Sequence, residues 1–306
     1  MLELIFNQLL KMLFIMILAF ICYKIKLVDQ EGNRTCSNLL LLVINPCLII
    51  TVYQTDYDTR LVRGLLVSFI YAIISHVIAI ALAHFLVPEK NNPDYCIDRF
   101  AAIYSNCGFI GIPLVRSVLG NEGVFYLTAY MAIFNLLTWT HGLGLLQGKF
   151  SLRQMKEGLT APIFIATTVA VILFFLQIRL PSPLLDSMNY VADMNTPLAM
   201  MIAGFSVAQA DLKKILTKLR IYWVCLLKLF AVPLATLIFL YFAKVDYAIT
   251  YTILIAAACP TATTTTLMAI RFNKNYTYAS EIFSLSTILS MVTIPIVAFI
   301  AGFLLK

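Results

Sequence analysis

NCGFIGIP, residues 106–113, lies within an apolar run over residues 99–119. It places Gly108, Gly111 and Pro113 within six residues. Glycine permits a close backbone approach or a positive φ, and proline lacks the N–H that a helix interior needs. A break inside a bilayer leaves backbone polar groups without partners, so such breaks persist where they line a cavity. The stretch predicts a membrane helix interrupted near its midpoint.

The composition indicates a chain whose main solvent is lipid. Hydrophobic residues make up 61% of the 306 residues and charged residues 12%, against about 45–50% and about 25% in soluble domains. The apolar residues form runs of the length that a helix needs to cross roughly 30 Å of hydrocarbon. We expect an all-α membrane protein of ten spans, which cover residues 4–23, 35–53, 61–87, 99–119, 122–146, 161–178, 184–207, 218–242, 247–270 and 276–305.

Two pairs of breaks at similar separations indicate an internal repeat. Pro46 and Pro197 lie mid-span and are 151 residues apart, and aligning Cys107 with Pro260 gives an offset of 153. The longest polar connection, residues 147–160, divides the chain into two halves of five spans, 1–146 and 161–306. An odd number of spans per half makes the halves inverted in the membrane, and secondary transporters are often built in this way.

A second interruption is predicted in the span 247–270, in the stretch CPTATTTT at residues 259–266. If a half-helix starts near Pro260, the threonines occupy its first turns. Backbone N–H groups there are unpaired and the helix dipole is positive, which favours an anion. The alternative interpretation is that the threonine hydroxyls bond back to helix carbonyls and allow close helix packing.

The distribution of basic residues predicts the orientation. With the N-terminus outside the cytoplasm, 14 lysines and arginines lie in or beside cytoplasmic connections and six lie on the other side. This excess follows the positive-inside rule. We therefore expect both termini on the non-cytoplasmic side and the 147–160 linker in the cytoplasm.

Enzymatic and metal-binding classes find no support in the sequence. The three histidines form no HExxH motif, and GxSxG and P-loop patterns are absent. The seven cysteines are odd in number and show no CxxC spacing, which argues against a disulfide or metal framework. We expect no cofactor and no nucleic-acid partner.

Four stretches together resemble the auxin efflux carrier family of membrane transporters. They are NCGFIGIPL (106–114), PLA (197–199) with Gly204, AAACP (256–260), and Ser286-Thr287 with Ile294-Pro295. The resemblance covers essentially the whole chain. Ser105, Thr261 and Lys228 stand where the plant PIN-FORMED carriers have proline, glutamine and arginine, and the long plant cytoplasmic loop is absent. These differences favour the bacterial branch, whose members handle dicarboxylates such as malate or malonate.

The resemblance implies a fold similar to sodium/proton antiporters and bile-acid symporters. The first, second, sixth and seventh spans would form a scaffold, and the third to fifth and eighth to tenth spans a mobile core. The fourth and ninth spans would cross at their breaks, and transport would be elevator-like. Asn106 matches the asparagine that contacts the substrate carboxylate in the plant carriers. The family also implies a homodimer.

The predicted sites fall into three groups. The substrate site is expected to draw on Asn106, Cys107, Gly108, Cys259, Pro260, Thr261, Thr263, Thr264, Asn45 and Asn135. The helix breaks are expected at Gly108, Gly111, Pro113, Pro260, Pro46 and Pro197. Lys228, His76 and Glu281 are candidates for charge or ion coupling. Each has a structural alternative: Lys228 snorkels or pairs, His76 is a satisfied core residue, Glu281 lies at the lipid–water interface, and Asn45 caps a broken helix.

The sequence therefore predicts a secondary transporter of a small organic anion in the plasma membrane, with a proton or sodium as possible coupling ion. A membrane receptor built on a transporter fold is the alternative. A receptor would not need matched breaks in both halves.

Overall fold

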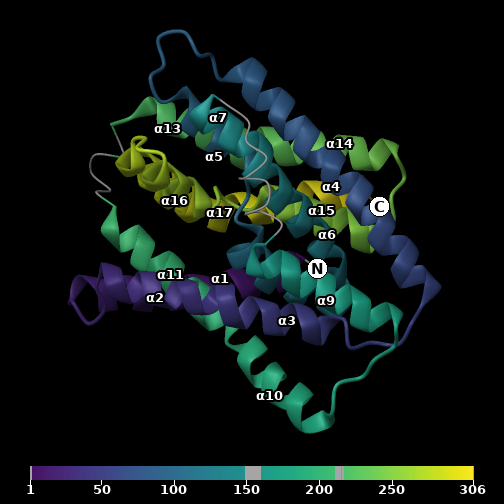
Figure 1. Cartoon of the computed structure of the whole chain (residues 1–306). Helices are drawn as coiled ribbons and strands as arrows, with labels where there is room; N and C mark the ends of the chain where they lie inside the picture. The colour runs from purple at the N-terminus through teal and green to yellow at the C-terminus, as the bar shows by residue number, and fades with distance from the viewer. Residues whose placement is uncertain (1, 149–159, 211–214, 216, 306) are drawn as a thin grey trace.

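The computed structural model describes residues 2–148, 160–210, 215 and 217–305, and most of the predicted linker 147–160 lies outside them. Within these residues the structure is helical, with one isolated β-bridge and no strand. The first half contains α1 (Leu2–Lys24), α2 (Gln30–Leu39), α3 (Asn45–Val52), α4 (Thr59–Leu86), α5 (Tyr95–Ile103), α6 (Ile112–Leu137) and α7 (Leu143–Gln147), with π-helical segments η1 (Leu40–Ile44), η2 (Cys107–Gly111) and η3 (Thr138–Gly142) (Figure 1).

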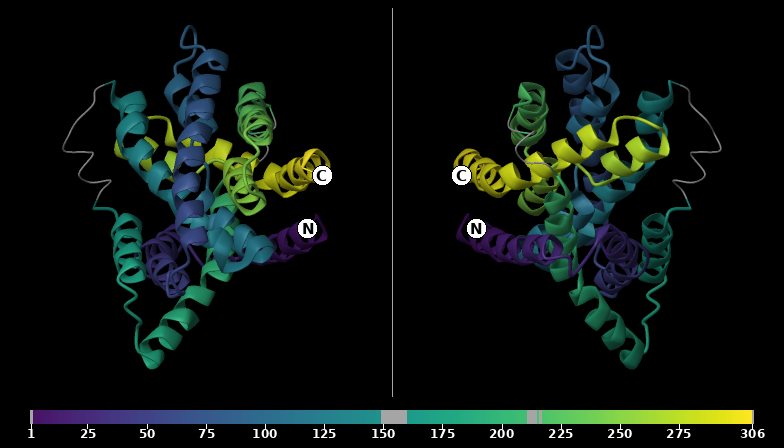
Figure 2. Two further views of the ribbon diagram at one scale, coloured as in Figure 1. Left: turned by 90° about the vertical axis from the view of Figure 1, so that its right-hand side faces the viewer. Right: turned by 90° about the vertical axis from the view of Figure 1, so that its left-hand side faces the viewer.

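The second half contains α9 (Pro162–Phe175), α10 (Ser182–Asp193), α11 (Asn195–Gln209), α13 (Leu219–Leu226), α14 (Val232–Phe242), α15 (Tyr247–Ala258), α16 (Thr264–Arg271) and α17 (Tyr276–Leu304), with the π-helical segment η4 (Leu227–Ala231) between α13 and α14. α10 projects from the rest of the bundle, and the two termini lie on one side of the molecule (Figure 2).

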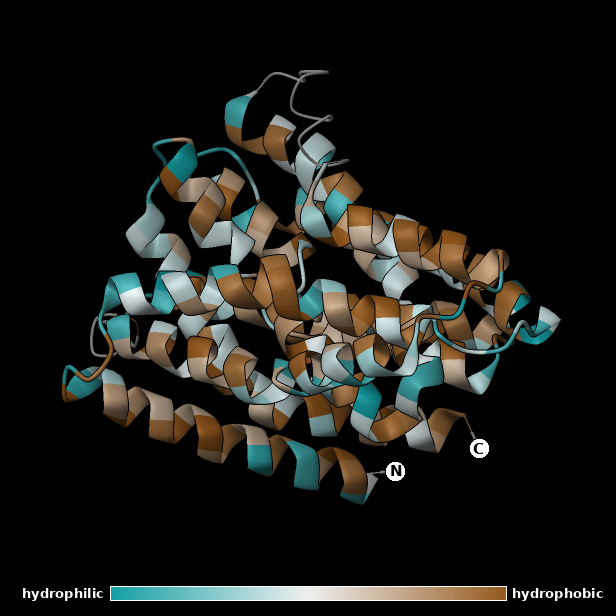
Figure 3. Ribbon diagram, turned by 60° about the horizontal axis from the view of Figure 1, so that its bottom comes forward, coloured by the Kyte–Doolittle hydropathy of each residue, from teal (hydrophilic) through white to brown (hydrophobic). Residues whose placement is uncertain are grey.

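Seven helical stretches of the described chain are long and apolar enough to cross a membrane. They cover residues 3–24, 30–52, 59–86, 107–147, 182–209, 219–242 and 276–304, and α9 and α15 are shorter apolar helices. Apolar residues dominate the helices and hydrophilic residues gather at their ends and connections (Figure 3). The chain is thus an all-helical, multi-pass membrane protein.

The connections lie at two opposite ends of the bundle. Figure 1 shows the links after α1, α4 and α16 at the left end and those after α3, α9 and α14 at the right end. Hydrogen bonds join connections at the same end: Tyr57 N–H donates to Gln177 Oε1 at 3.1 Å, and Asn275 Nδ2 to Asp94 at 3.4 Å. Successive long helices therefore run back and forth between the two ends.

Two glycines allow close contacts between helices, one between the two halves of the chain and one within the first half. A Cβ added to Gly204 of α11 would lie 2.3 Å from the Met16 carbonyl oxygen of α1. A Cβ at Gly64 of α4 would lie 2.6 Å from the Tyr126 ring of α6. These glycines allow the helices to pack at short distance, as is common in membrane interiors.

The expected breaks at Pro46 and Pro197 take a different form from a full interruption. The helix through Pro46 continues from α2 to α3 and is distorted only into the π-helical segment η1. Pro197 lies inside α11, and the irregular residue is Met194, just before that helix. A proline disturbs the turn that precedes it, because its missing N–H and its ring affect the carbonyl four residues earlier. The distortion therefore falls N-terminal to each proline.

Candidate functional site: the crossing of two interrupted helices

Two interruptions, residues 104–106 and 259–263, meet in the interior and are called the crossing here. Ser105 and Thr261 form an antiparallel β-bridge. The Asn106 N–H donates to the Pro260 carbonyl at 2.8 Å, and the Ala262 N–H to the Tyr104 carbonyl at 2.9 Å. Each segment thus supplies backbone partners that the other would lack in lipid.

The sequence explains why the chain leaves the helix at these points. Pro260 cannot donate to the helix that ends at Ala258, and the chain is extended at Cys259. In the other half Pro113 follows the break, in the second turn of the continuous helix formed by η2 and α6, and the π-helical distortion η2 lies just before it. Gly108 differs from the expectation: it lies inside η2, and positive φ among the described glycines occurs only at Gly120 and Gly148.

Gly111 provides a close approach between the halves. A Cβ there would lie 3.4 Å from both Cys107 Cβ and Cys259 Sγ. The two thiols are free and buried on either side of this point. Cys107 and Cys259 therefore fill the apolar packing of the crossing.

Thr261 holds the crossing together. Its hydroxyl donates to the Ala101 carbonyl of α5 at 3.0 Å, and its N–H donates to Ser286 Oγ of α17 at 3.2 Å. Its polar groups are therefore already engaged within the protein. Among the predicted ligands, Thr261 is better assigned to the support of the site than to the substrate.

Both half-helices that start at the crossing lack a side-chain cap. Asn106 precedes η2 and Thr263 precedes α16, and neither side chain makes a capping hydrogen bond. Both residue types normally cap helices by accepting a first-turn N–H. First-turn N–H groups lack acceptors within their own helix, although the Thr265 N–H of α16 already donates to the Ala262 carbonyl at 3.0 Å, and the helix dipoles add positive potential. Two uncapped helix N-termini thus meet in the membrane interior.

Unsatisfied side-chain groups accompany these two helix starts. Asn106 is 4% exposed, and within the described part of the chain its Nδ2 and the buried hydroxyls of Thr264 and Thr265 have no partner. Gly108, Thr263 and Thr264 are themselves partly exposed. Buried donors are normally paired, so these unpaired donors indicate a place for an acceptor ligand.

Lys228 is a buried positive charge beside the crossing. It is fully buried in η4, and its ammonium donates to Ser105 Oγ and, at 3.1 Å, to the Ala257 carbonyl. These acceptors lie where α5 and α15 end. The negative ends of both half-helices therefore face a lysine.

His76 and Asn135 have separate surroundings. His76 of α4 is buried, its Nδ1–H donates to the Ala72 carbonyl at 2.8 Å, and its ring lies 4.6 Å from that of Tyr130. Its Nε2 is buried without a partner. Asn135 is partly exposed on α6. His76 thus packs in the protein interior against Tyr130. Among the described residues, no hydrogen bond joins the Asn135 side chain to the crossing.

Asn45 pairs with a residue that the sequence analysis missed. Asn195 Nδ2 donates to Asn45 Oδ1 at 2.7 Å, and both side chains are buried. Asn45 Nδ2 and Asn195 Oδ1 have no partner among the residues that the structure describes. α11, which begins at Asn195, packs against η2. The available signal was the spacing, since both asparagines stand just before the mid-span prolines.

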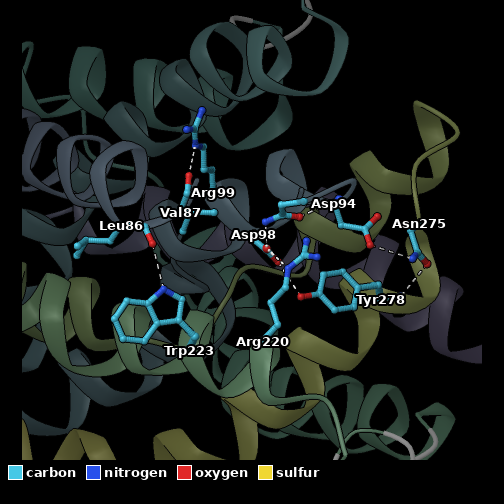
Figure 4. A network of polar contacts seen from close by, with 10 residues as sticks. Leu86, Val87, Asp94, Asp98, Arg99, Arg220, Trp223, Asn275 and Tyr278 are labelled. Carbon is cyan, nitrogen blue, oxygen red and sulfur yellow. Dashed lines mark hydrogen bonds and ion pairs between the residues drawn. The ribbon is translucent and has the colours of Figure 1, made fainter. Parts of the chain in front are cut away.

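A second polar network lies at the end of the bundle where α5 begins (Figure 4). Buried Asp98 accepts from Arg220 Nε at 2.6 Å, from the Tyr278 hydroxyl at 2.8 Å and from Asn92 Nδ2 at 2.9 Å. Glu281 is 3% exposed and pairs with Lys218 at 2.8 and 2.5 Å. The structure thus places the buried Glu281 carboxylate in an ion pair with a partly exposed lysine, and this pair joins α17 to the start of α13.

These contacts divide the polar residues into two sets by role. Thr261, Ser286 and the Asp98 network join helices through their hydrogen bonds, although Arg220 Nη2 is buried without a partner among the described residues. The crossing combines uncapped helix starts, unpaired donors and a buried cation, an arrangement suited to an anion. Within the described residues, no group of three or more potential metal ligands is found.

Comparison with known proteins agrees with this architecture. A family model described as membrane transport protein matches residues 4–154 and 149–298, essentially the whole chain. A search of curated proteins found no match. The chain therefore belongs to the auxin efflux carrier family and is a membrane transporter.

Proposed function

We propose that the protein is a secondary carrier of a small organic anion that binds by its carboxylate at the crossing. The observation that carries the proposal is the pair of uncapped helix starts at Asn106 and Thr263. An anion that enters the membrane must exchange its hydration for fixed donors, and helix N-termini supply them without a full buried charge. Malate, malonate or an auxin-like acid has the required chemistry.

The ligand set of this proposal is narrower than the sequence alone suggested. It consists of Asn106 Nδ2, the first-turn N–H groups after Asn106 and Thr263, and the Thr264 hydroxyl. The unpaired state of Asn106 Nδ2 and Thr264 Oγ1 supports their inclusion. Thr261 and Pro260 are assigned a structural role, because the Thr261 hydroxyl donates to the Ala101 carbonyl and the Pro260 carbonyl accepts from the Asn106 N–H.

The same proposal includes an elevator mechanism. The scaffold would be α1, α2–α3, α9 and α10–α11, and the core would be α4 to α7 and α13 to α17, as two inverted repeats of five spans. The buried Asp98–Arg220–Tyr278 network supports a core that moves as one body, because it ties α5 to α13 and α17. Asn45 and Asn195 are the fixed polar groups that the scaffold would offer beside η2.

The proposed setting is the plasma membrane, with a homodimer joined through scaffold helices and both termini outside the cytoplasm. The end of the bundle with Arg99, Lys218, Arg220 and Arg271 would face the cytoplasm, in keeping with the positive-inside rule. Labelling of a single-cysteine Ser151→Cys variant tests the orientation. Modification by an impermeant reagent from outside intact cells would contradict it.

Flux into proteoliposomes tests the function. Purified protein is reconstituted and supplied in turn with labelled acetate, malonate, malate and indole-3-acetate. We expect saturable uptake of at least one carboxylate, faster exchange when the same anion is present inside, and no uptake by empty liposomes. Binding without flux, or flux restricted to cations or neutral solutes, would refute an anion carrier.

A further inference from the structure

Lys228 is a buried cation at the centre of the molecule. Its side chain is fully buried in η4, in the middle of the 219–242 span. Among the described residues, none of the ion pairs involves it. A buried charge is normally paired with an opposite charge or neutralised. Another source of negative potential must therefore stabilise this ammonium.

Two helix ends supply that potential. Ala257 belongs to the last turn of α15, and its carbonyl accepts from Lys228 Nζ at 3.1 Å. Ser105, the second acceptor, follows the end of α5 by two residues. The C-terminal end of a helix carries a partial negative charge from carbonyls without intrahelical partners. The single positive charge of Lys228 therefore lies against the negative C-terminal ends of two half-helices.

The acceptors that surround Lys228 are also those that a soluble cation would use. Carbonyl and hydroxyl oxygens, here of Ala257 and Ser105, are ligands for hard cations. Carriers with broken helices often place such cations against unwound carbonyls and helix C-termini. In this chain an amino group that is covalently part of η4 already fills the position.

We propose that Lys228 is the resident cation of the crossing and takes the place of a dissolved coupling cation. It compensates the negative helix ends while the uncapped helix starts remain free for the anion. The carrier would then bind and move its anion without sodium, a consequence that rests on the proposed function. The cation site itself does not depend on the identity of the substrate.

Ammonium-dependent stability of Lys228→Ala tests the cation site directly. The truncation leaves Ser105 and Ala257 oxygens without their donor and opens space for a small cation. We expect the variant to be less stable than the wild type in N-methylglucamine chloride. Ammonium or methylammonium chloride at equal ionic strength should raise its Tm by about 2 °C or more, because a ligand that binds only the folded state stabilises it.

Two controls separate a specific site from a general salt effect. Lys11→Ala removes an exposed lysine from α1, and neither this variant nor the wild type should respond to ammonium. Lys228→Arg keeps the charge and should retain more stability than Lys228→Met, which keeps the length without the charge. If Lys228→Ala is too unstable to purify, Lys228→Gln takes its place, with a smaller ammonium response expected.

Equal stability of the Arg and Met variants, or no response of the truncated variant to either ammonium ion, would overturn the resident-cation assignment. The functional consequence has its own readout. Malonate uptake by the wild type should be unchanged when N-methylglucamine replaces sodium on both sides. Uptake that requires sodium would refute this inference while leaving the anion-carrier proposal intact, and absence of any carboxylate uptake would refute the latter alone.

Discussion

Replacement of Asn106 by alanine separates a ligand-binding role from a structural one. The side chain is buried at the start of η2, and its Nδ2 has no partner among the described residues. The backbone N–H of the residue, which bonds to Pro260, is kept in the variant. Asn106→Ala therefore removes a donor that is available to an anion and leaves the frame of the crossing in place.

The variant should bind the carboxylate much more weakly but keep nearly the stability of the wild type. A hydrogen bond to a charged group is worth about 1.5–3 kcal/mol, so carboxylate binding should weaken by about 10- to 100-fold. An unsatisfied buried donor costs about 1–3 kcal/mol of stability. Its removal offsets the loss of side-chain packing, so the free energy of unfolding should change by less than about 1 kcal/mol.

Titration calorimetry and thermal unfolding in detergent measure both effects on the same protein samples. Malonate and malate serve as ligands, and whichever binds the wild type is used for the variants. Asn33→Ala is the matched control, because Asn33 of α2 already donates to Ser206 at 3.2 Å, and its affinity should equal that of the wild type. Unchanged affinity in Asn106→Ala at normal stability would mean that the anion binds elsewhere.

Three further pairs of variants test other parts of the account. Thr264→Val should lower carboxylate affinity by up to about 10-fold with little change in Tm, whereas Thr261→Val should cost about 1 kcal/mol of stability because it loses the bond to Ala101; the reverse pattern would exchange their roles. Gly204→Val should destabilise the protein by about 1–3 kcal/mol in a thermal unfolding assay, since a Cβ at this position would lie 2.3 Å from the Met16 carbonyl oxygen. Gly144→Ala should be neutral or stabilising in the same assay, because a Cβ there meets nothing within 4 Å. Asp98→Asn should lower the free energy of unfolding by about 3 kcal/mol, because it leaves the Arg220 guanidinium without its buried carboxylate partner. Glu89→Gln, at a 60% exposed carboxylate, should cost under about 1 kcal/mol. Equal losses of stability in the two variants would argue against a buried network.

The class of the protein and the location of the crossing are accessible from sequence because they depend on local chemistry. Apolar runs of membrane length require helices, and Pro260 cannot continue the helix that precedes it. The family assignment from four short stretches is confirmed by the match over the chain. The number of spans and the inverted repeat stay predictions.

The detailed roles depend on contacts that sequence spacing does not reveal. Thr261 and Thr264 are alike in sequence, yet only Thr261 finds Ala101 and Ser286 within reach. Gly108 was expected at the break because glycine tolerates positive φ, but the adjacent extended residues and the bridge to Thr261 absorb the interruption. The role of a side chain depends on its neighbours in space, and at the crossing many of these neighbours belong to the other half of the chain.

Charged residues illustrate the same limit. Asp98, Arg220 and Glu281 can be placed near span ends by counting residues, and both interpretations of Glu281, interfacial position and ion coupling, stay predictions. Their burial follows from pairing: Asp98 with Arg220, and Glu281 with Lys218. A buried carboxylate is tolerated only with such partners, and the partners lie 122 and 63 residues away in the chain.

The most direct test of the central claim is a cryo-electron-microscopy structure of the protein with the carboxylate that it transports. The account predicts density for the anion at the crossing, with one carboxylate oxygen within hydrogen-bond distance of Asn106 Nδ2 and the first turn of η2 or α16 facing it. Density at the Asp98–Arg220 network, or at any site that leaves Asn106 Nδ2 unpaired, would contradict it.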